Sequence, residues 1–412
     1  MKHCAAVLCL LATGAISSVS AQQGPVPTGI PALDHVFVIM MENHAYKQVL
    51  GNPNMPFINQ YANNVNSARN YFAVGHPSLT NYLEITGGSN FGIRDDNSPD
   101  WHDLACTSNI AGKTVSLEVT PTAICPISGT GQDAATPVID TTNETSGPPG
   151  VIDVDGKVGY KANPKTVGES IADQLVDAGL DWKSYQESLT PAGADGVDLA
   201  DGLITNLVDI PSTLPGDGLT NKRLIGLYAV KHNPFAYFES IQEGLNPELS
   251  FQRMAGFEGT GGFFYDLANN RVPAYSFVVP NQCHDQHGRG NAGPECAYDP
   301  NDNGTLTGLN PALMYEGDIT IQTLVTAIHR SLAWSLGKTA IVIVWDENDY
   351  SISPTTNQVL LTVDTNYGTK GVQSKNFYTH FSLLKSIEAG FGLPCLNHAC
   401  DSTTSVMSDL FK

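Results

Sequence analysis

Acidic residues directly follow two of the apolar runs in this chain. Glu42 and Asn43 come after the run VFVIMM. Asp346 and Glu347 come after the run TAIVIVW. Carboxylates gathered in one place repel each other unless a cation neutralises them, and a hard divalent ion would do so. The pattern therefore predicts a divalent-metal site formed by these four residues, with the metal and the number of ions left open. The alternative is that the acids cap helices or face solvent.

A serine occupies the predicted start of a helix in the segment GHPSLTNYLEITGG. Pro77 suits the first helical position, which places Ser78 in the first turn, and the glycine pair at 87–88 ends the helix. Free backbone N–H groups and the helix dipole favour an anion at this point. A metal ion nearby would lower the pKa of the serine hydroxyl and polarise a phosphoryl oxygen. Ser78 is therefore the predicted nucleophile for attack on phosphorus, and Asn81 the predicted donor to a non-bridging oxygen. The alternative is that Ser78 is only a helix residue.

Histidines supply the remaining candidates. His284 and His287 lie in one loop after the apolar run YSFVV, and His380 stands alone further along the chain. Such side chains could bind metal, hold phosphate or protonate the leaving alcohol. A lone histidine is more often structural, which is the alternative for His380. His232 in KHNPF and Lys183 in WKSYQE are weaker candidates to line a substrate pocket.

The apolar runs also predict the fold. None of the three runs alternates between apolar and polar residues, which indicates strands buried on both faces in a parallel sheet. A capping box at 166–169 is expected to open a helix over 170–178, and Asp318 is expected to cap a second helix that ends near 336. This alternation predicts a doubly wound α/β sheet, mostly parallel and flanked by helices. Ligands bind beyond the carboxyl ends of such strands, where the acidic and histidine clusters lie.

Composition indicates how the chain is organised. Residues 1–21 have the basic start, short apolar run and small residues of a cleaved signal peptide, so the protein is expected to be secreted, with a membrane anchor as the alternative. Residues 22–412 are expected to form a single catalytic domain, with Gly- and Pro-rich insertions around 90–165 and 189–220 that form a cap. The formal net charge of −20 argues against nucleic acid and anionic membranes as partners. The oligomeric state is left open.

Cysteine and asparagine patterns fit secretion. Eight cysteines occur, and Cys4 and Cys9 fall in the predicted signal peptide. The others form three local couples, and nearest-neighbour pairing is the simplest of the 15 possibilities. The predicted disulfides are Cys106–Cys125, Cys283–Cys296 and Cys395–Cys400. Asn143 and Asn303 begin glycosylation acceptor motifs.

Seven segments in order along the chain carry a resemblance. They are DHVFVIMMEN, GHPSLTNYLEITGG, WKSYQE, KHNPF, PNQCHDQH, WDEND and YTHFSLLKSIEAGFGLP. Together they resemble the phosphoesterase family of phospholipases C and secreted acid phosphatases, which looks like a branch of the alkaline phosphatase superfamily. The resemblance implies an alkaline phosphatase-like fold, metal ligands at Glu42, Asn43, Asp346 and Glu347, and a Ser78 nucleophile. It also implies that Asn81 binds phosphate and that His284, His287 and His380 belong to the active site.

The resemblance favours one activity over two alternatives. The phospholipase-like branch has an arginine directly after the asparagine, where this chain has Tyr82, and often carries further C-terminal domains. Both differences favour an acid phosphatase that acts on small phosphorylated substrates over a phospholipase C. The compact size and acidic pI resemble those of the secreted fungal acid phosphatases, to which the chain is expected to be closest. A phosphodiesterase or phospholipase C on the same site, or a non-catalytic secreted glycoprotein, are the alternatives. The chain has no G-x-S-x-G, Walker loop or strand-linked G-x-G-x-x-G, which argues against lipase-type and nucleotide-binding proteins.

Overall fold

The computed structural model describes residues 23–91, 96, 168–189, 227–289, 292–301, 304–348 and 357–412, without the side chains of residues 242 and 243. The predicted signal peptide and most of the two predicted insertions lie outside these residues. So do the expected Cys106–Cys125 couple and the two expected glycosylation sites, Asn143 and Asn303.

The strands of the described residues form a large mixed sheet of eight strands in the order β5-β4-β6-β1-β7-β8-β2-β9. Its centre is β6 (Tyr275–Val279), β1 (His35–Met41) and β7 (Thr339–Trp345), which run parallel. On one side lie β4 (Trp182–Gln186) and β5 (Met254–Ala255), also parallel. On the other side lie β8 (Leu361–Thr365), antiparallel to its neighbours, then β2 (Asn66–Ala68) and β9 (Gln373–Ser374). A separate parallel pair joins β3 (Tyr71–Phe72) and β10 (Tyr378–Thr379).

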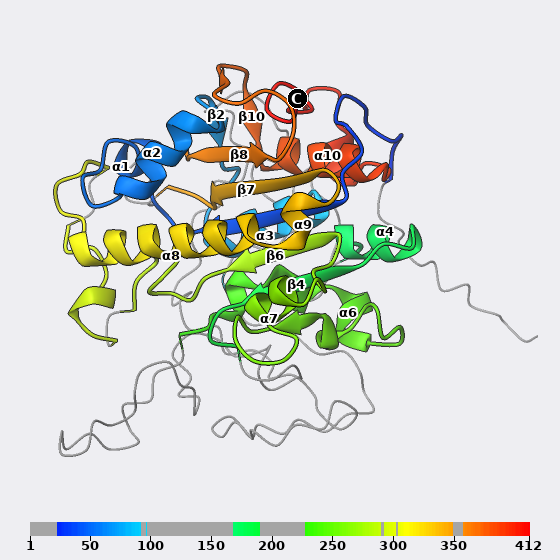
Figure 1. Ribbon diagram of the computed structural model, residues 1–412, viewed down its shortest axis with the longest axis horizontal. Coiled ribbons are helices and arrows are strands. Elements are labelled where there is room, and N and C mark those ends of the chain that lie inside the picture. The colour runs from blue at the N-terminus through cyan, green and yellow to red at the C-terminus, as the bar shows by residue number, and fades with distance from the viewer. Residues whose placement is uncertain are drawn as a thin grey trace, which may run out of the picture.

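Helices cover both faces of the sheet (Figure 1). In the view of Figure 1, α8 (Pro311–His329) lies in front, with α2 (Pro56–Asn64), α7 (Phe263–Ala268) and α9 (Leu332–Ser335) packed against it. Behind the sheet lie α3 (Ser78–Gly87), α10 (His380–Phe391) and α4 (Ile171–Asp177). The shorter helices are α1 (Tyr46–Val49), α6 (Glu239–Glu243) and the 3₁₀ turns η2 (Val230–His232), η3 (Pro234–Tyr237), η4 (Phe251–Arg253), η5 (Pro294–Cys296) and η6 (Asn397–Cys400). The doubly wound α/β expectation is confirmed.

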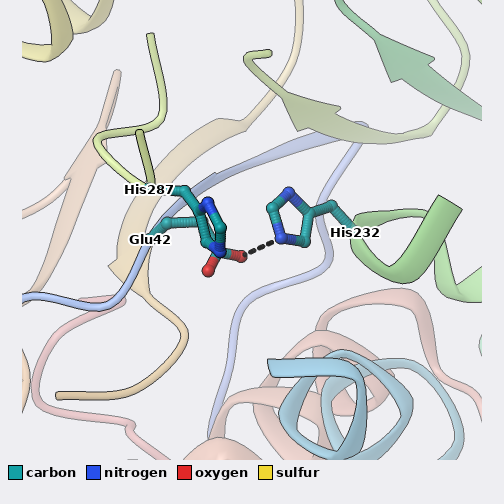
Figure 2. A group of neighbouring side chains, drawn as sticks. All are labelled: Glu42, His232 and His287. Carbon is teal, nitrogen blue, oxygen red and sulfur yellow. Dashed lines mark ion pairs between the residues drawn. The ribbon is translucent and has the colours of Figure 1, made fainter. Parts of the chain in front are cut away.

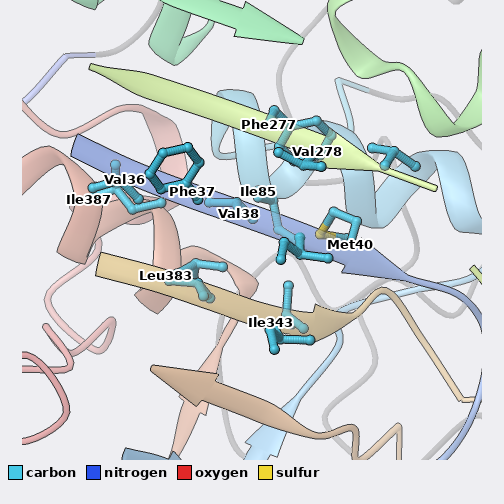
Figure 3. Packing of buried hydrophobic residues seen from close by; sticks show 14 of the residues in the cluster. Val36, Phe37, Val38, Met40, Ile85, Phe277, Val278, Ile343, Leu383 and Ile387 are labelled. Carbon is cyan, nitrogen blue, oxygen red and sulfur yellow. The ribbon is translucent and has the colours of Figure 1, made fainter. Parts of the chain in front are cut away.

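The central strands are buried on both faces because their sequences are continuously apolar. Every residue of β6 and β7 is buried, as is every residue of β1 after His35. Ile85 of α3 and Leu383 and Ile387 of α10 pack against these strands (Figure 3). Each Å² of apolar area that is removed from water stabilises the folded protein by about 25 cal/mol. This packed layer therefore holds the strand ends in fixed positions.

Two predicted helix starts are wrong. The cap of α4 is Ser170, whose Oγ accepts a hydrogen bond from the Ala172 amide while the Asp173 carboxylate accepts one from the Ser170 amide. The capping box therefore lies at 170–173, not at 166–169. The cap of α8 is Asn310, and Asp318 lies inside that helix. The Asp318 carboxylate instead accepts the Phe57 and Ile58 amides, each at 2.8 Å, and so caps α2. A carboxylate satisfies the free N–H groups of any helix start that the fold brings within reach.

The structure contains two of the expected disulfides, Cys283–Cys296 and Cys395–Cys400. No helix in the described part of the chain is both long and apolar enough to cross a bilayer.

Candidate active site

The carboxyl ends of β1 and β7 bring the predicted acidic residues together. Met41 and Trp345 are partners in the parallel register, so the residues that follow them leave the sheet side by side. The Asn43 amide donates to Asp346 Oδ1 at 3.0 Å. The Glu42 amide donates to the Asp285 carbonyl at 2.8 Å, which joins the loop after β6 to the same edge. Three strand-end loops therefore meet where the sequence predicted a site.

Ser78 lies at the centre of these loops, as the first residue of α3. Pro77 is the N-cap, so the helix begins one residue later than the sequence suggested. The Ser78 hydroxyl is buried and faces Glu42 Oε2 at 3.0 Å and Glu347 Oε1 at 3.3 Å. A hydroxyl carries one hydrogen and can donate to only one of these carboxylates at a time. The arrangement therefore places two carboxyl groups beside the serine oxygen, and a cation would balance their charge when both are ionised.

Asn81 positions the serine segment. Its Oδ1 accepts the Val74 and Gly75 amides at 3.1 and 3.0 Å. Its Nδ2 donates to the Gly75 carbonyl at 2.9 Å and to Glu347 Oε2 at 3.0 Å. Both amide hydrogens are therefore used within the protein. The sequence predicted that Asn81 donates to a phosphoryl oxygen. To do so, Asn81 must give up one of these two bonds.

A second group at the same edge consists of Glu42, His232 and His287, whose potential ligand atoms lie within 4.8 Å of one another (Figure 2). His232 Nε2 pairs with Glu42 Oε1 at 3.2 Å, and its Nδ1 pairs with Asp285 Oδ2 at 3.2 Å. The ring stacks on Tyr82 with 5.4 Å between centroids. Each nitrogen of His232 faces a carboxylate, an arrangement that favours the doubly protonated ring.

The electrostatic setting of His287 differs from that of His232. Its Nε2 lies 3.1 Å from the Lys231 ammonium, and its Nδ1 lies 2.9 Å from the Gly288 carbonyl. An ammonium group only donates and a carbonyl only accepts, so these two contacts fit a neutral ring with the hydrogen on Nδ1. The Asp285 carboxylate accepts the His287 backbone amide and pairs with the ring of His232. The carboxylate pairing therefore favours a cation at His232, not at His287.

Burial makes the carboxylates of this site hard to ionise without further positive charge. It raises the pKa of Glu42 to about 8, although Lys231 and the Tyr82 hydroxyl oppose the shift. The pKa of Asp346 is raised well above its usual range, first by burial and then by Glu42 and Glu347. Asp346 Oδ2 is buried and has no hydrogen-bond partner among the described residues, although the Ser78 hydroxyl lies near enough to this carboxyl group to oppose the rise in its pKa. A divalent cation fits such a donor set, because it would supply the missing partner and keep several carboxylates ionised.

Comparison with known proteins assigns the chain to a family. The sequence model of the Phosphoesterase family matches residues 52–298, more than half of the chain. The chain belongs to the Phosphoesterase family. This confirms the resemblance drawn from the sequence.

Named relatives of this family member are phosphatases. A probable acid phosphatase from Kluyveromyces lactis is 22% identical over 366 residues, which cover 89% of this chain and 60% of the relative. An acid phosphatase from Aspergillus fumigatus is 22% identical over 366 residues, covering 89% and 56%. The chain thus spans less than two thirds of the length of these two relatives. A phosphatidylinositol-3-phosphatase from Mycobacterium tuberculosis is 21% identical over 383 residues, covering 92% and 84%.

Among solved structures, a protein of the alkaline phosphatase superfamily from Vibrio parahaemolyticus is similar over 96% of this chain and 76% of that chain. The sequence identity is 10% and the TM-score is 0.47.

Three predicted residues of this phosphoesterase have other partners. His380 donates from Nε2 to the Asp346 carbonyl at 2.5 Å and accepts the Tyr71 hydroxyl at Nδ1. Burial lowers the pKa of His380 to about 4, so the ring is neutral and positions Asp346. His284 bonds Glu187 at 2.8 Å.

Lys183 is the third of these residues. Its ammonium group donates to Asp266 at 2.5 Å. Lys183 lies near the start of β4, whereas the site lies at the carboxyl ends of the parallel strands.

The sequence analysis missed several residues of the site. Lys231 is buried beside His287 and Asp96, and its only signal was its place next to His232 in KHNPF. Tyr82 donates to Glu42 Oε1 at 2.5 Å, a role that its position after Asn81 did not reveal. Asp96 accepts the Leu79 amide in the first turn of α3. It had no recognisable sequence signal.

Proposed function

We propose that this protein is an acid phosphatase that releases inorganic phosphate from phosphate monoesters, with Ser78 as nucleophile and a divalent metal ion as cofactor. The observation that supports this most is the position of the Ser78 hydroxyl, buried at a helix start between Glu42 and Glu347. A serine hydroxyl is a weak nucleophile until a general base or a metal ion activates it, and carboxylates beside it can hold such an ion. Membership of the Phosphoesterase family and relatives named acid phosphatase support the same reaction.

The metal is proposed to bind Asp346, Glu347, Glu42 and Asn43. The buried Asp346 Oδ2 and the raised pKa values of Glu42 and Asp346 support this set. When bound, the ion would lower the pKa of the serine hydroxyl and polarise the phosphoryl group. Glu42, His232 and His287 form the competing set of ligands.

The side chains suggest how the bonds change. The Ser78 hydroxyl passes its proton to one of the carboxylates that it faces, Glu42 or Glu347. Its Oγ forms a bond to phosphorus while the bond from phosphorus to the alcohol oxygen breaks, and the alcohol leaves with a proton. His232 is proposed to give that proton, because its two carboxylate neighbours favour the doubly protonated ring. Water then attacks the phosphoserine and its proton returns to His232. The bond from phosphorus to Ser78 Oγ breaks, the serine takes its proton back from the carboxylate, and inorganic phosphate leaves. Lys231 and His287 lie beside His232 and are proposed to face the phosphoryl oxygens.

We further propose that the protein is secreted as a single catalytic domain after removal of residues 1–21. Two disulfides in the described residues support an oxidising compartment. Mass spectrometry of protein recovered from the medium would locate the mature N-terminus, and a start at residue 1 would contradict cleavage.

The test compares 4-nitrophenyl phosphate with bis(4-nitrophenyl) phosphate, before and after chelation and after each divalent metal is restored. We expect monoester turnover that chelation abolishes. Ser78→Ala is expected to lower kcat by at least about 10³-fold with metal content unchanged, as loss of covalent catalysis requires. Ser276→Ala removes another buried serine hydroxyl, on β6, and is the matched control.

Each other result points to a different conclusion. Near-normal turnover by Ser78→Ala would contradict the nucleophile. Faster turnover of the diester would favour a phosphodiesterase or phospholipase C. Absence of turnover with every metal would favour a non-catalytic glycoprotein.

A further inference from the structure

Arg289 is a buried cation that has no partner in the described part of the chain. The residue is 8% exposed, and its Nε is buried without a hydrogen-bond partner. No hydrogen bond or ion pair joins the rest of its guanidinium to a described residue. The other buried cations differ, because Lys231 pairs with Asp96 and the mostly buried Lys183 pairs with Asp266. The chain has 41 acidic residues against 21 basic ones, so acidic partners are plentiful. An unpaired arginine in such a protein requires an explanation.

The backbone around Arg289 is held firmly. The Arg289 amide donates to the Cys296 carbonyl at 2.5 Å, and its carbonyl accepts the Ala292 amide at 2.9 Å. The Cys283–Cys296 disulfide closes the same loop. Gly288 has a φ of +85°, and a Cβ there would come within 3.2 Å of Tyr298. The loop therefore fixes Arg289 two residues beyond His287.

A buried charge without a partner destabilises the folded protein, and such groups normally pair or bind a ligand. We propose that Arg289 binds an anionic group on the leaving-group side of the substrate, either a carboxylate or a second phosphate. The guanidinium is planar and matches both groups with two parallel hydrogen bonds. The proposal rests on the proposed phosphatase function, and it names the class of ester that the site prefers.

The contacts indicate a group beyond the phosphoryl group that is transferred. The ion pairs of the site carboxylates Glu42, Asp285 and Glu347 are made by histidines and not by Arg289, although Arg289 follows His287 by two residues. The Cα atoms of His287 and Arg289 are at most roughly 7 Å apart, so one small substrate can span both residues. A second anion on the carbon skeleton of the alcohol would meet these conditions. Lys231 and the histidines would then bind the transferred phosphoryl group.

The test uses esters that differ by one carboxylate. Phosphate release is measured from phenyl phosphate, 3-carboxyphenyl phosphate and 4-carboxyphenyl phosphate by the metal-loaded protein. The quantity compared is the ratio of kcat/KM for the better carboxylated ester to kcat/KM for phenyl phosphate. Arg289→Gln is expected to lower this ratio by about 10- to 100-fold, the factor that loss of a charged hydrogen bond gives. Arg289→Lys is expected to give a ratio between those of the wild-type protein and Arg289→Gln. Arg330→Gln, at an exposed arginine, is the control and should leave the ratio unchanged.

Two results would overturn the proposal. One is an unchanged ratio in Arg289→Gln. The other is an equal loss for all three esters, which would place Arg289 at the transferred phosphoryl group or in the fold. Thermal unfolding gives an independent readout, because removal of an unpaired buried charge should leave Tm unchanged or raise it. A Tm lowered by more than about 5 °C in Arg289→Gln would show that Arg289 has structural partners and would equally refute the proposal.

Failure of the proposed function can be told apart from failure of this inference. If the wild-type protein hydrolyses none of the esters, binding of benzene-1,3-dicarboxylate is measured by calorimetry. Arg289→Gln should then bind it at least about 10-fold more weakly than the wild-type protein does. Equal affinity of the two proteins, or no binding by the wild-type protein, would overturn the role of Arg289.

Discussion

Tyr82 gives the sharpest test of how the protein tunes its metal site. Its hydroxyl donates to Glu42 Oε1 at 2.5 Å, both groups are fully buried, and its ring stacks on His232. Tyr82→Phe keeps the ring and removes only this hydrogen bond. A hydrogen bond to a charged group contributes about 1.5–3 kcal/mol, so its loss should weaken metal binding by roughly 10- to 150-fold.

The effect of Tyr82→Phe should depend on pH. The hydrogen bond lowers the pKa of Glu42, which burial has raised to about 8 in the metal-free protein. Below that pKa the metal-free carboxyl is protonated, so the hydrogen bond to the carboxylate is gained only with the metal, and its loss weakens affinity fully. Above that pKa the metal-free carboxylate already has the hydrogen bond, so its loss affects both states and nearly cancels. The weakening should therefore be large at pH 5 and small at pH 9.

The assay is calorimetric titration of the metal-free protein with a buffered divalent metal at both pH values. Tyr185→Phe is the matched control, because Tyr185 is also buried and donates to a carboxylate, Asp266, at 2.8 Å outside the site. It should leave metal affinity unchanged. Equal metal affinity of Tyr82→Phe and wild type at pH 5, or an equal loss in the Tyr185 variant, would refute this account of Glu42.

Three further predictions concern the same edge of the sheet. Asp346→Asn should reduce metal content, measured by elemental analysis, far more than His232→Gln; the opposite order would assign the ion to Glu42, His232 and His287. The metal-free protein should lose thermal stability as pH rises from 4.5 to 8, because a carboxyl with a raised pKa stabilises the fold only while protonated, and added metal should suppress the loss. If the thermal stability of the metal-free protein does not change with pH, the raised pKa of Glu42 is contradicted. His380→Asn should lower kcat without moving either limb of the pH profile above pH 5, because burial lowers the pKa of His380 to about 4; a shifted limb would make His380 a proton donor.

The apolar runs and the residues after them could be interpreted without a structure. A run with no alternation must be buried on both faces, and parallel strands place their carboxyl ends at one edge, so Glu42 and Asp346 were predicted to meet. The helix that begins at Ser78 could be predicted from local signals, namely the proline before it and the two glycines at its end. Local disulfides at 283–296 and 395–400 likewise needed only sequence proximity.

Side-chain partners were decided by the tertiary structure. Asp285 lies between His284 and His287 in sequence, yet its carboxylate pairs with the His232 ring, because the loop after β6 turns back on itself at Gln286, with a φ of 83°. Asp318 looked like the start of its own helix but caps α2. A carboxylate bonds whichever donor lies within about 3 Å, and that donor belongs to a segment hundreds of residues away as readily as to the next turn. Sequence spacing fixes which residues leave the sheet at one edge, whereas only the packed loops decide which of them touch.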